Sequence, residues 1–192
     1  MKRAEQRRRT REALLEAAAE EFVTRGYAQA TLQGAADRLG LTRGTVLFHF
    51  SSKDALRDAL ADWADARLLE ALDPARPVRP DQPDDPRGRF VGALLELAEV
   101  YSTDVRVRAG VALQDERSRE RPAVSAWRAA LDARAASYLA QVDGRPDAAT
   151  GTPVAATALA AMFLGVLRDP AWRTERQLHE ALTCVVAAVP RR

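Results

Sequence analysis

The 192-residue sequence predicts an all-α fold, and three observations support this prediction. Apolar residues make up 47% of the chain, which is enough for a sizeable buried core. Ala, Leu, Arg, Asp and Glu dominate, glycine is scarce, and there is no run of β-branched residues, a composition that favours helices. Apolar side chains recur at intervals of three and four residues, as they do on one face of an amphipathic helix.

The first predicted helix spans residues 5–25, with Leu14, Ala18 and Phe22 on one face and Gly26 at its end. Six of the first eleven residues are basic, against a single glutamate. A basic arm of this kind suits a phosphate backbone, although a solvated tail would have the same composition.

Two short helices are predicted next, over residues 32–39 and 43–48. Thr31 and Thr42 have the side-chain chemistry to cap the two helices, since their hydroxyls can accept from free backbone N–H groups. Gly40 between them suits the left-handed stop of a helix. This order of helix, glycine-containing turn and helix is typical of the helix-turn-helix motif, in which the second helix enters the major groove of DNA.

A fourth helix is predicted to begin at residues 51–54, with Ser51 or Ser52 as its cap, and to run to about residue 72. Five prolines then recur at every third position up to residue 86. This period matches a polyproline II turn, so the stretch reads as a semi-rigid spacer or as a recognition site for a proline-binding partner. Because a loop this long is unusual within a compact domain, we place the boundary between an N-terminal and a C-terminal unit here.

The predicted domains are a helix-turn-helix domain over residues 1–54 and a ligand-binding and dimerisation domain over residues 55–192. Within the second, residues 55–72 form a connecting helix and residues 73–86 the proline-rich loop. Helices are expected over residues 87–102 and 105–113.

A further helix is expected to open at Pro122, which suits a first helical position, with an apolar stripe on one face. That stripe holds Val124, Trp127, Leu131 and Tyr138.

The last two predicted helices have the patterns of a subunit interface. Residues 154–167 are apolar nearly all round, and residues 178–189 are amphipathic. Two such pairs could form a four-helix bundle between subunits, so we predict a homodimer through these helices; the alternative is that both are buried within one subunit.

Several classes of protein are disfavoured. The only histidines are His49 and His179 and the only cysteine is Cys184, so there is no cluster with metal-ligand spacing and no internal disulfide. No glycine-rich phosphate loop occurs, and we expect neither a cofactor nor an enzyme. The longest apolar run falls short of the roughly 18 residues that a membrane span needs, and the charged first eleven residues do not form a signal peptide. We expect a cytoplasmic protein without membrane contact.

One string of residues closely resembles the DNA-binding motif of the TetR family of bacterial repressors. It consists of Thr31, Gly40, Thr42, Gly44-Thr45, Phe48-His49-Phe50, Ser52-Lys53 and Leu56. The resemblance implies a homodimeric repressor that binds a pseudo-palindromic DNA operator and is released by a small-molecule effector. The sequence departs from the family pattern at Leu47, where the family commonly has a tyrosine whose hydroxyl reaches a phosphate, and at Ala35 and Leu39.

The chemistry of the motif and the resemblance together assign roles to its residues. Facing the base edges or the groove floor we expect Gln33, Arg43, Gly44, Thr45 and His49, with Phe48 beside them. Arg43 could read a guanine with two hydrogen bonds or contact a phosphate instead. Thr31, Thr42 and Lys53 would hold phosphates, although the two threonines could serve as caps alone. His49 could also be an ordinary surface histidine.

A second resemblance concerns the predicted sensing domain. Residues 105–113, with the sequence VRVRAGVAL, followed by Trp127, look like the branch of the family that senses γ-butyrolactone-type signals, in which the tryptophan lines the ligand pocket. A core tryptophan is the alternative. The candidate residues for an effector pocket are Leu94, Leu113, Gln114, Trp127, Leu131, Phe163 and Val166.

Rival functions remain open at this point. Within the family, the chain could repress an efflux gene or another local gene in response to an unrelated ligand, or be an orphan receptor that binds no lactone. Outside it, a helical enzyme or an interaction module acting through the proline segment would be the alternatives.

Overall fold

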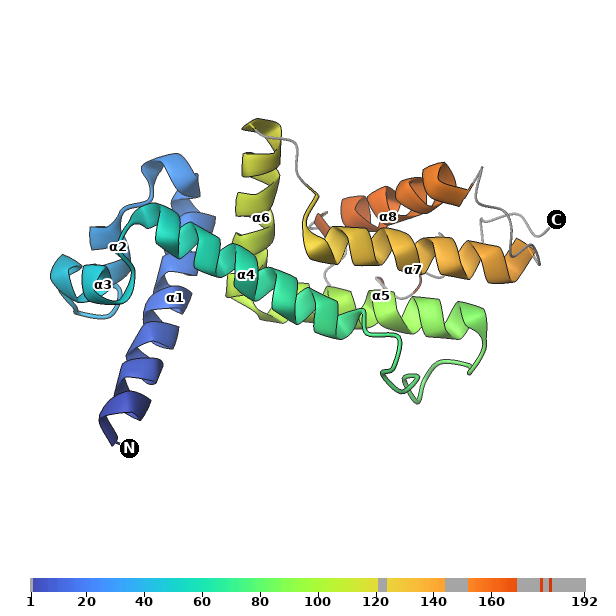
Figure 1. Ribbon diagram of the computed structural model, residues 1–192, viewed down its shortest axis with the longest axis horizontal. Helices are drawn as coiled ribbons and strands as arrows, with labels where there is room; N and C mark the ends of the chain where they lie inside the picture. Colours follow the sequence, from blue (N-terminus) through green and yellow to red (C-terminus); the bar gives the residue numbers. More distant parts are fainter. Residues whose placement is uncertain (1, 121–123, 144–151, 169–176, 178–179, 181–192) are drawn as a thin grey trace. The chain divides into compact units, whose positions relative to one another are not determined.

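The computed structural model describes residues 2–120, 124–143, 152–168, 177 and 180. Across these residues the chain forms eight helices and no strand (Figure 1), which confirms the predicted all-α fold. None of the described helices is long and apolar enough to cross a membrane.

The chain divides into two compact units, each made of two separate stretches of sequence. The first unit combines Met1–Leu68 with Tyr101–Val124, and the second combines Leu69–Val100 with Ser125–Arg192. This grouping does not coincide with a boundary after residue 54, so the predicted division into a DNA-binding and a sensing domain stays a functional prediction.

The first unit holds five helices around one core. They are α1 (Lys2–Gln29), α2 (Leu32–Asp37), α3 (Arg43–His49), most of α4 (Lys53–Ala71) and α6 (Val105–Glu120). The core takes fully buried side chains from different helices, including Leu14, Val46, Leu60 and Leu113. Because α6 contributes to this core and packs along α1, the motif is supported by more than the connecting helix that the sequence indicated.

Two glycines with positive φ set the path of the chain into the motif. Gly26 has φ of 71° and interrupts α1, as predicted, although the helix resumes for a short turn to Gln29. Gly40 has φ of 64°, the left-handed conformation that a side chain would strain, so it turns the chain after α2. The helix itself ends at Asp37, two residues earlier than predicted.

The start of α6 is fastened to α4 by a small polar cluster. Trp63 Nε1 donates to Asp104 Oδ2 at 2.9 Å, and the guanidinium of Arg106 lies 4.1 Å from the Trp63 ring centroid. Asp104 Oδ1 also caps α6 by accepting from Arg106 N at 2.9 Å.

Farther along its length, α6 crosses α4 at Gly110, where a Cβ would lie 2.3 Å from the carbonyl oxygen of Leu60. The helix is continuous to Glu120 and does not end near residue 113 as predicted.

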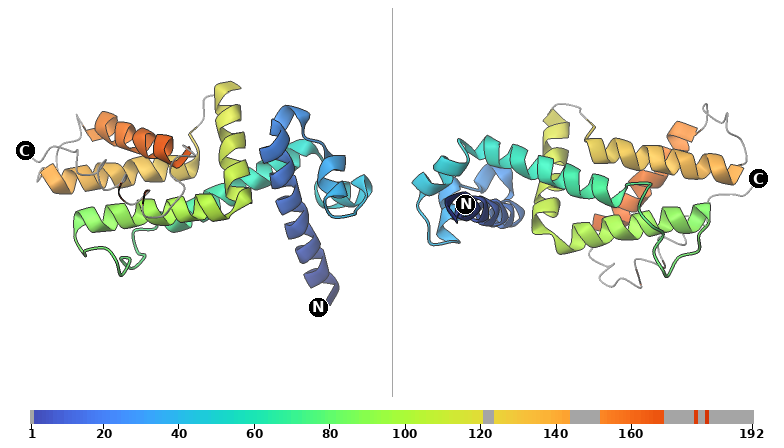
Figure 2. Two further views of the ribbon diagram at one scale, coloured as in Figure 1. Left: turned by 180° about the vertical axis from the view of Figure 1, so that it is seen from behind. Right: turned by 60° about the horizontal axis from the view of Figure 1, so that its bottom comes forward.

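The second unit is built from α5 (Pro86–Thr103), α7 (Ala126–Asp143) and α8 (Thr152–Arg168). Helices α5 and α7 lie side by side (Figures 1 and 2), and the rings of Phe90 and Tyr138 stack with centroids 4.8 Å apart. Helix α8 packs against α7.

Helix α7 begins at Ala126, so the prediction that Pro122 opens it was wrong. For the same reason Val124 precedes the helix and is 71% exposed, whereas Trp127, Leu131 and Tyr138 are buried as predicted. Apart from Glu180, the predicted last helix, over residues 178–189, lies outside the described residues.

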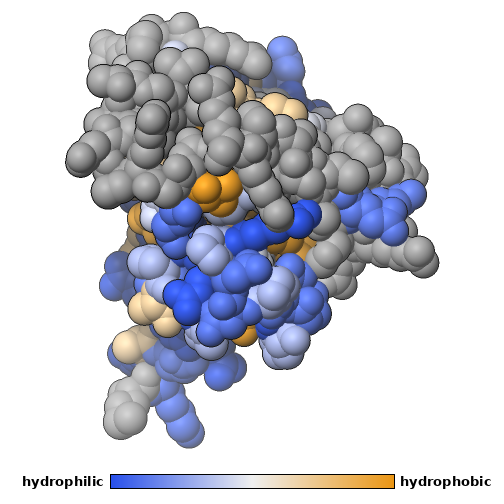
Figure 3. Space-filling view, turned by 90° about the vertical axis from the view of Figure 1, so that its right-hand side faces the viewer, coloured by the Kyte–Doolittle hydropathy of each residue, from blue (hydrophilic) through white to orange (hydrophobic). Residues whose placement is uncertain are grey.

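The proline-rich stretch is a folded loop and not an extended spacer. Its arginines bind the side of α5: Arg76 lies 3.2 Å from Glu96, and Arg79 lies 3.3 Å from Glu99. Asp85 Oδ1 accepts from Gly88 N at 2.7 Å and so caps α5 at its first turn, where proline stands in its favoured first helical position. The coloured part of the face in Figure 3 is largely hydrophilic, with small separate hydrophobic areas.

Candidate nucleic-acid interface

Two threonine caps and one glycine position the second helix of the motif. Thr31 Oγ1 accepts from Gly34 N at 2.9 Å and starts α2, and Thr42 Oγ1 accepts from Thr45 N at 3.2 Å and starts α3. Both caps confirm the local prediction. Each cap is worth about 1 kcal/mol of helix stability. Because both hydroxyls are engaged in the free protein, a phosphate contact by either would have to share the same oxygen.

Helix α3 has one buried side and one exposed side. Val46 is fully buried, and Phe50, directly after the helix, is also buried, so these two residues fix the helix on the core of the first unit. On the outer side Arg43 and Gly44 are exposed, and the ring of Phe48 is 67% exposed. A large aromatic ring left in water on a short, well-anchored helix indicates a surface made for contact.

Four predicted contact residues have partners within the protein. Thr45 shares a hydroxyl–hydroxyl contact of 3.1 Å with Thr42. Gln33 donates to Asp37 Oδ1 at 2.6 Å. Lys53 Nζ donates to the Ala28 carbonyl at 3.3 Å and lies 4.4 Å from the Tyr27 ring centroid. A phosphate contact by Lys53 would therefore require its ammonium group to leave the carbonyl.

Arg7 and Arg11 join this surface, although the sequence reasoning did not single them out. The guanidinium of Arg7 lies 5.0 Å from the Phe48 ring centroid, and that of Arg11 lies 4.5 Å from the Phe50 ring centroid. Their spacing of four residues in a basic stretch, which places them on one face of a helix, was the available signal.

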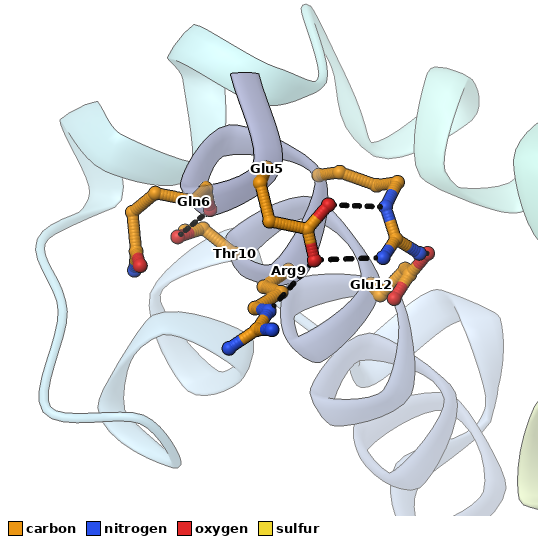
Figure 4. Close-up of polar contacts among 6 residues, drawn as sticks. Glu5, Gln6, Arg9, Thr10 and Glu12 are labelled. Atoms are coloured by element: carbon orange, nitrogen blue, oxygen red, sulfur yellow. Dashed lines mark hydrogen bonds and ion pairs between the residues drawn. The ribbon is translucent and has the colours of Figure 1, made fainter. Parts of the chain in front are cut away.

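Neighbouring arginines in α1 are neutralised within the helix. Glu5 accepts from Arg9 at 2.9 Å (Figure 4) and also pairs with Arg8, which in turn lies 2.7 Å from Glu12. The arm is thus helical from Lys2 onward, and its ion pairs leave Arg7 and Arg11 as the arginines that lie over the aromatic rings beside α3.

The charge state of His49 follows from this arrangement. Partial burial lowers the pKa of His49 below its usual value, and the positive charges of Arg7 and Arg11 lower it further. The imidazole is therefore neutral at pH 7 in the free protein and can offer one donor and one acceptor nitrogen to a base edge.

The beginning of α4 is held against the end of α1 by Tyr27. Its hydroxyl donates to Asp54, and Arg57 lies 5.1 Å from its ring centroid. Burial, followed by the hydrogen bond to Asp54, raises the pKa of Tyr27 to about 12. The same hydrogen bond, followed by Arg57, holds the pKa of Asp54 below its usual value.

The candidate effector residues are divided between the two units. Leu94, Trp127, Leu131 and Phe163 are all buried in the second unit. Leu113 instead belongs to the core of the first unit, and Gln114 there donates to the Ala61 carbonyl at 3.1 Å. Val166 falls in α8, but its side chain lies outside the described part. The structure therefore places four of the seven candidates in the second unit, where all four are buried.

One polar atom in the second unit was not anticipated. Oδ1 of Asp132 on α7 is buried and has no hydrogen-bond partner among the described residues. A buried acceptor without a partner typically reduces stability by about 1–3 kcal/mol, so it calls for an explanation. An aspartate beside an apolar stripe reads as a solvent-facing residue in sequence, which is why it was missed.

The described residues contain no group of three or more His, Cys, Asp or Glu side chains that could hold a metal ion.

Comparisons with known proteins extend these observations. Residues 14–60 match the family described as "Bacterial regulatory proteins, tetR family". The chain is 41% identical over 58 residues to the HTH-type transcriptional regulator TtgR of Pseudomonas putida. That match covers 30% of this chain and 28% of TtgR, so it spans less than a third of the relative's length.

Solved structures match along most of the chain. SmeT, described as the repressor of the Stenotrophomonas maltophilia multidrug efflux pump SmeDEF, is 26% identical with a TM-score of 0.64, over 93% of this chain and 89% of SmeT. A γ-butyrolactone receptor described as an ArpA-like protein is 20% identical with a TM-score of 0.65, over 94% of this chain and 96% of the receptor. At that identity the second likeness concerns the fold alone. Together, the matches confirm the resemblance to the TetR family.

Proposed function

Because residues 14–60 match the tetR family and most of the chain shares the fold of a solved repressor, SmeT, we propose that the protein is a DNA-binding transcriptional repressor of the TetR type. It acts as a homodimer on a pseudo-palindromic operator. The observation that carries this proposal is α3, a capped helix anchored by Val46 whose outer side exposes Arg43, Gly44 and Phe48.

Helix α3 enters the major groove, and a two-fold dimer presents two such helices to half-sites about 34–36 Å apart or a multiple of that distance. Arg43 and His49 face base edges, and Gly44 allows the backbone to come close to the groove floor. Arg7, Arg11 and Lys53 neutralise phosphates, which fixes the register on the duplex without reading sequence.

Dimerisation is supported by the outer side of α8. Ala158, Ala161, Met162 and Gly165 are exposed at helical spacing, and Met162 is 53% exposed. A continuous apolar stripe on a surface helix is typical of a subunit interface.

The second unit senses a small apolar signalling molecule, such as a γ-butyrolactone or a related autoregulator. Support comes from the burial of Trp127, Leu131, Leu94 and Phe163 in this unit and from the fold likeness to a γ-butyrolactone receptor. The buried acceptor on Asp132 would suit a hydroxyl group on the ligand. The likeness to SmeT favours a second candidate, a repressor of an efflux gene that responds to an unrelated apolar ligand.

Selection of bound DNA from a random pool, followed by titration of the selected duplex at several salt concentrations, tests the DNA-binding function. We expect a palindromic consensus and a steep linear fall of log K with log salt, of about 0.9 per neutralised phosphate. His49→Ala should abolish binding while leaving the circular dichroism spectrum unchanged. A pool that yields no consensus together with a flat salt dependence would reject the proposal.

The role of Arg43 can be separated from a phosphate contact by comparing Arg43→Lys with Arg43→Ala. If Arg43 reads a guanine through two hydrogen bonds, the lysine variant should lose roughly 1–3 kcal/mol of discrimination at one operator position. If it contacts a phosphate, lysine should preserve sequence preference and most of the affinity.

Release from DNA by an added lactone tests the effector. Trp127→Phe is the suitable variant, because removing the whole buried ring would cost about 3–5 kcal/mol and endanger the fold. It should weaken release and leave DNA binding intact. Full response of this variant would show that Trp127 is a core residue only.

A further inference from the structure

We propose that a polar cavity in the second unit, beside the proline-rich loop and distinct from the apolar effector residues, binds a small organic carboxylate. The cavity has a volume of about 340 Å³ and lies between residues 73–79, one side of α5 and Arg134 of α7. None of the seven sequence-predicted effector residues lines it. The inference does not depend on the repressor function or on the lactone.

The surroundings of Arg134 indicate that the cavity binds an anion. Its guanidinium is half-buried and donates to two backbone carbonyls, that of Leu72 at 3.1 Å and that of Arg89 at 3.4 Å. Among the described residues no carboxylate lies within ion-pair distance of it. Asp73 is the nearest acidic influence, and one of its carboxylate oxygens accepts from the backbone N–H of Ala75.

Burial without a counter-ion has a measurable consequence for this group. Desolvation lowers the pKa of Arg134, and Asp73 only partly offsets the effect. A guanidinium nevertheless stays charged in proteins, so the protein's own groups stabilise its charge poorly. A bound carboxylate would supply the missing counter-charge and could accept from the unused donors of the planar fork.

The other arginines around the cavity already have acidic partners. Arg76 pairs with Glu96 at 3.2 Å, Arg79 with Glu99 at 3.3 Å, and Arg89 with Asp84 at 2.7 Å. The three arginines form part of the cavity wall, and their acidic partners neutralise their charges. Within the described part of the chain, Arg134 is thus the uncompensated cation among the arginines of the lining.

The space itself results from glycine on α5. Gly92 lines the cavity, and a Cβ added there would meet its nearest neighbour, Gln82 Cγ, at 3.7 Å, which is ordinary contact. One turn earlier, a Cβ at Gly88 would lie 1.9 Å from the carbonyl oxygen of Pro83, so the loop closes directly on the helix. The glycine at position 88 therefore lets the loop approach α5 closely, and the glycine at position 92 leaves room for the cavity.

The lining also explains why the ligand should be organic. Apolar surface from Pro74, Pro77, Val78 and Ala93 accompanies the charged groups. The volume falls at the lower end of the range for small-molecule sites, about 300–1,000 Å³. A carboxylate with a short apolar tail matches this combination better than an inorganic ion.

A thermal-shift and calorimetry series on the full chain tests the proposal, with hexanoate as the probe and hexanamide as its neutral counterpart at constant ionic strength. Hexanoate should raise the melting temperature saturably, and hexanamide should not. Arg134→Gln, which retains a donor for the backbone carbonyls, should weaken hexanoate binding about tenfold or more. Arg128→Gln on the same helix is the control, because Arg128 does not line the cavity.

Gly92→Ala provides a second variant that keeps every charge. The added methyl group takes up space in the cavity without a clash, so the variant should fold and bind hexanoate more weakly. Equal shifts from hexanoate and hexanamide, or unchanged hexanoate binding in both Arg134→Gln and Gly92→Ala, would overturn the proposal and leave Arg134 as a cap for the end of α4. Inorganic phosphate that binds as tightly as hexanoate would overturn the assignment to organic carboxylates.

Discussion

At the scale of single residues, Leu47 is the clearest departure of α3 from the TetR-family pattern that this stretch resembles. Its side chain is 41% exposed on α3, where it offers DNA no hydrogen bond. Leu47→Tyr should raise operator affinity about three- to tenfold, because one added hydrogen bond to a phosphate is worth about 0.5–1.5 kcal/mol.

The matched control for this change is Leu47→Phe, which adds the ring without the hydroxyl. Fluorescence anisotropy with the selected operator measures both variants. If phenylalanine improves binding as much as tyrosine, the gain comes from apolar contact, and the proposed phosphate contact at this position is wrong.

Residues whose role depends on adjacent backbone could be predicted, and residues whose role depends on distant partners could not. Thr31 and Thr42 each accept from a backbone N–H three positions away, and Gly40 turns the chain through its own φ, so the caps and the turn were evident from the sequence. Lys53 and Arg11 lie against rings 26 and 39 residues away along the chain, which no local pattern encodes.

At the scale of elements, the crossing of α6 over α4 is a close contact between two helices that a single substitution can test. Gly110→Ala should lower the free energy of unfolding by about 1–3 kcal/mol, because its Cβ would overlap a backbone oxygen that cannot move without shifting α4. Urea denaturation followed by circular dichroism measures the change.

Gly92→Ala is the control for Gly110→Ala, because it also replaces a glycine within a helix but at a position where the neighbouring atoms leave room for a methyl group. It should raise stability by about 0.5–1 kcal/mol, the ordinary gain of alanine over glycine in a helix. Similar effects of the two substitutions would mean that the α4–α6 contact is looser than the structure indicates.

Most helices could be predicted from periodicity, but their ends and partners could not. Three of the four residues in the stripe predicted for α7 are buried, yet the helix starts four residues after Pro122 and leaves Val124 exposed before it. The proline-rich stretch carried a period of three, but ion pairs from Arg76 and Arg79 to α5 decide its fold. The proline content predicts that a helix ends here, but it does not predict which element the following loop packs against.

At the scale of the whole molecule, the exposed stripe on α8 predicts how the active species assembles. Met162→Glu should convert the proposed dimer into a monomer in sedimentation experiments, because two carboxylates would face each other across a two-fold apolar contact. Operator affinity should fall strongly, since a monomer reads one half-site.

Ala133→Glu adds the same charge at an exposed position of α7 and serves as the control. A Met162→Glu protein that remains dimeric and binds the operator normally would place the subunit interface elsewhere.

The placement of α6 also bears on protein engineering. Ala109 and Leu113 complete the core shared with α2 and α3, although they follow Leu68 by some forty residues in the sequence. A fragment cut after Leu68 would leave that core uncovered, and a chimaera joined there would place a foreign helix against Leu14 and Leu60. Exchange of operator specificity between relatives is therefore better attempted by grafting the outer side of α3 than by swapping a contiguous N-terminal module.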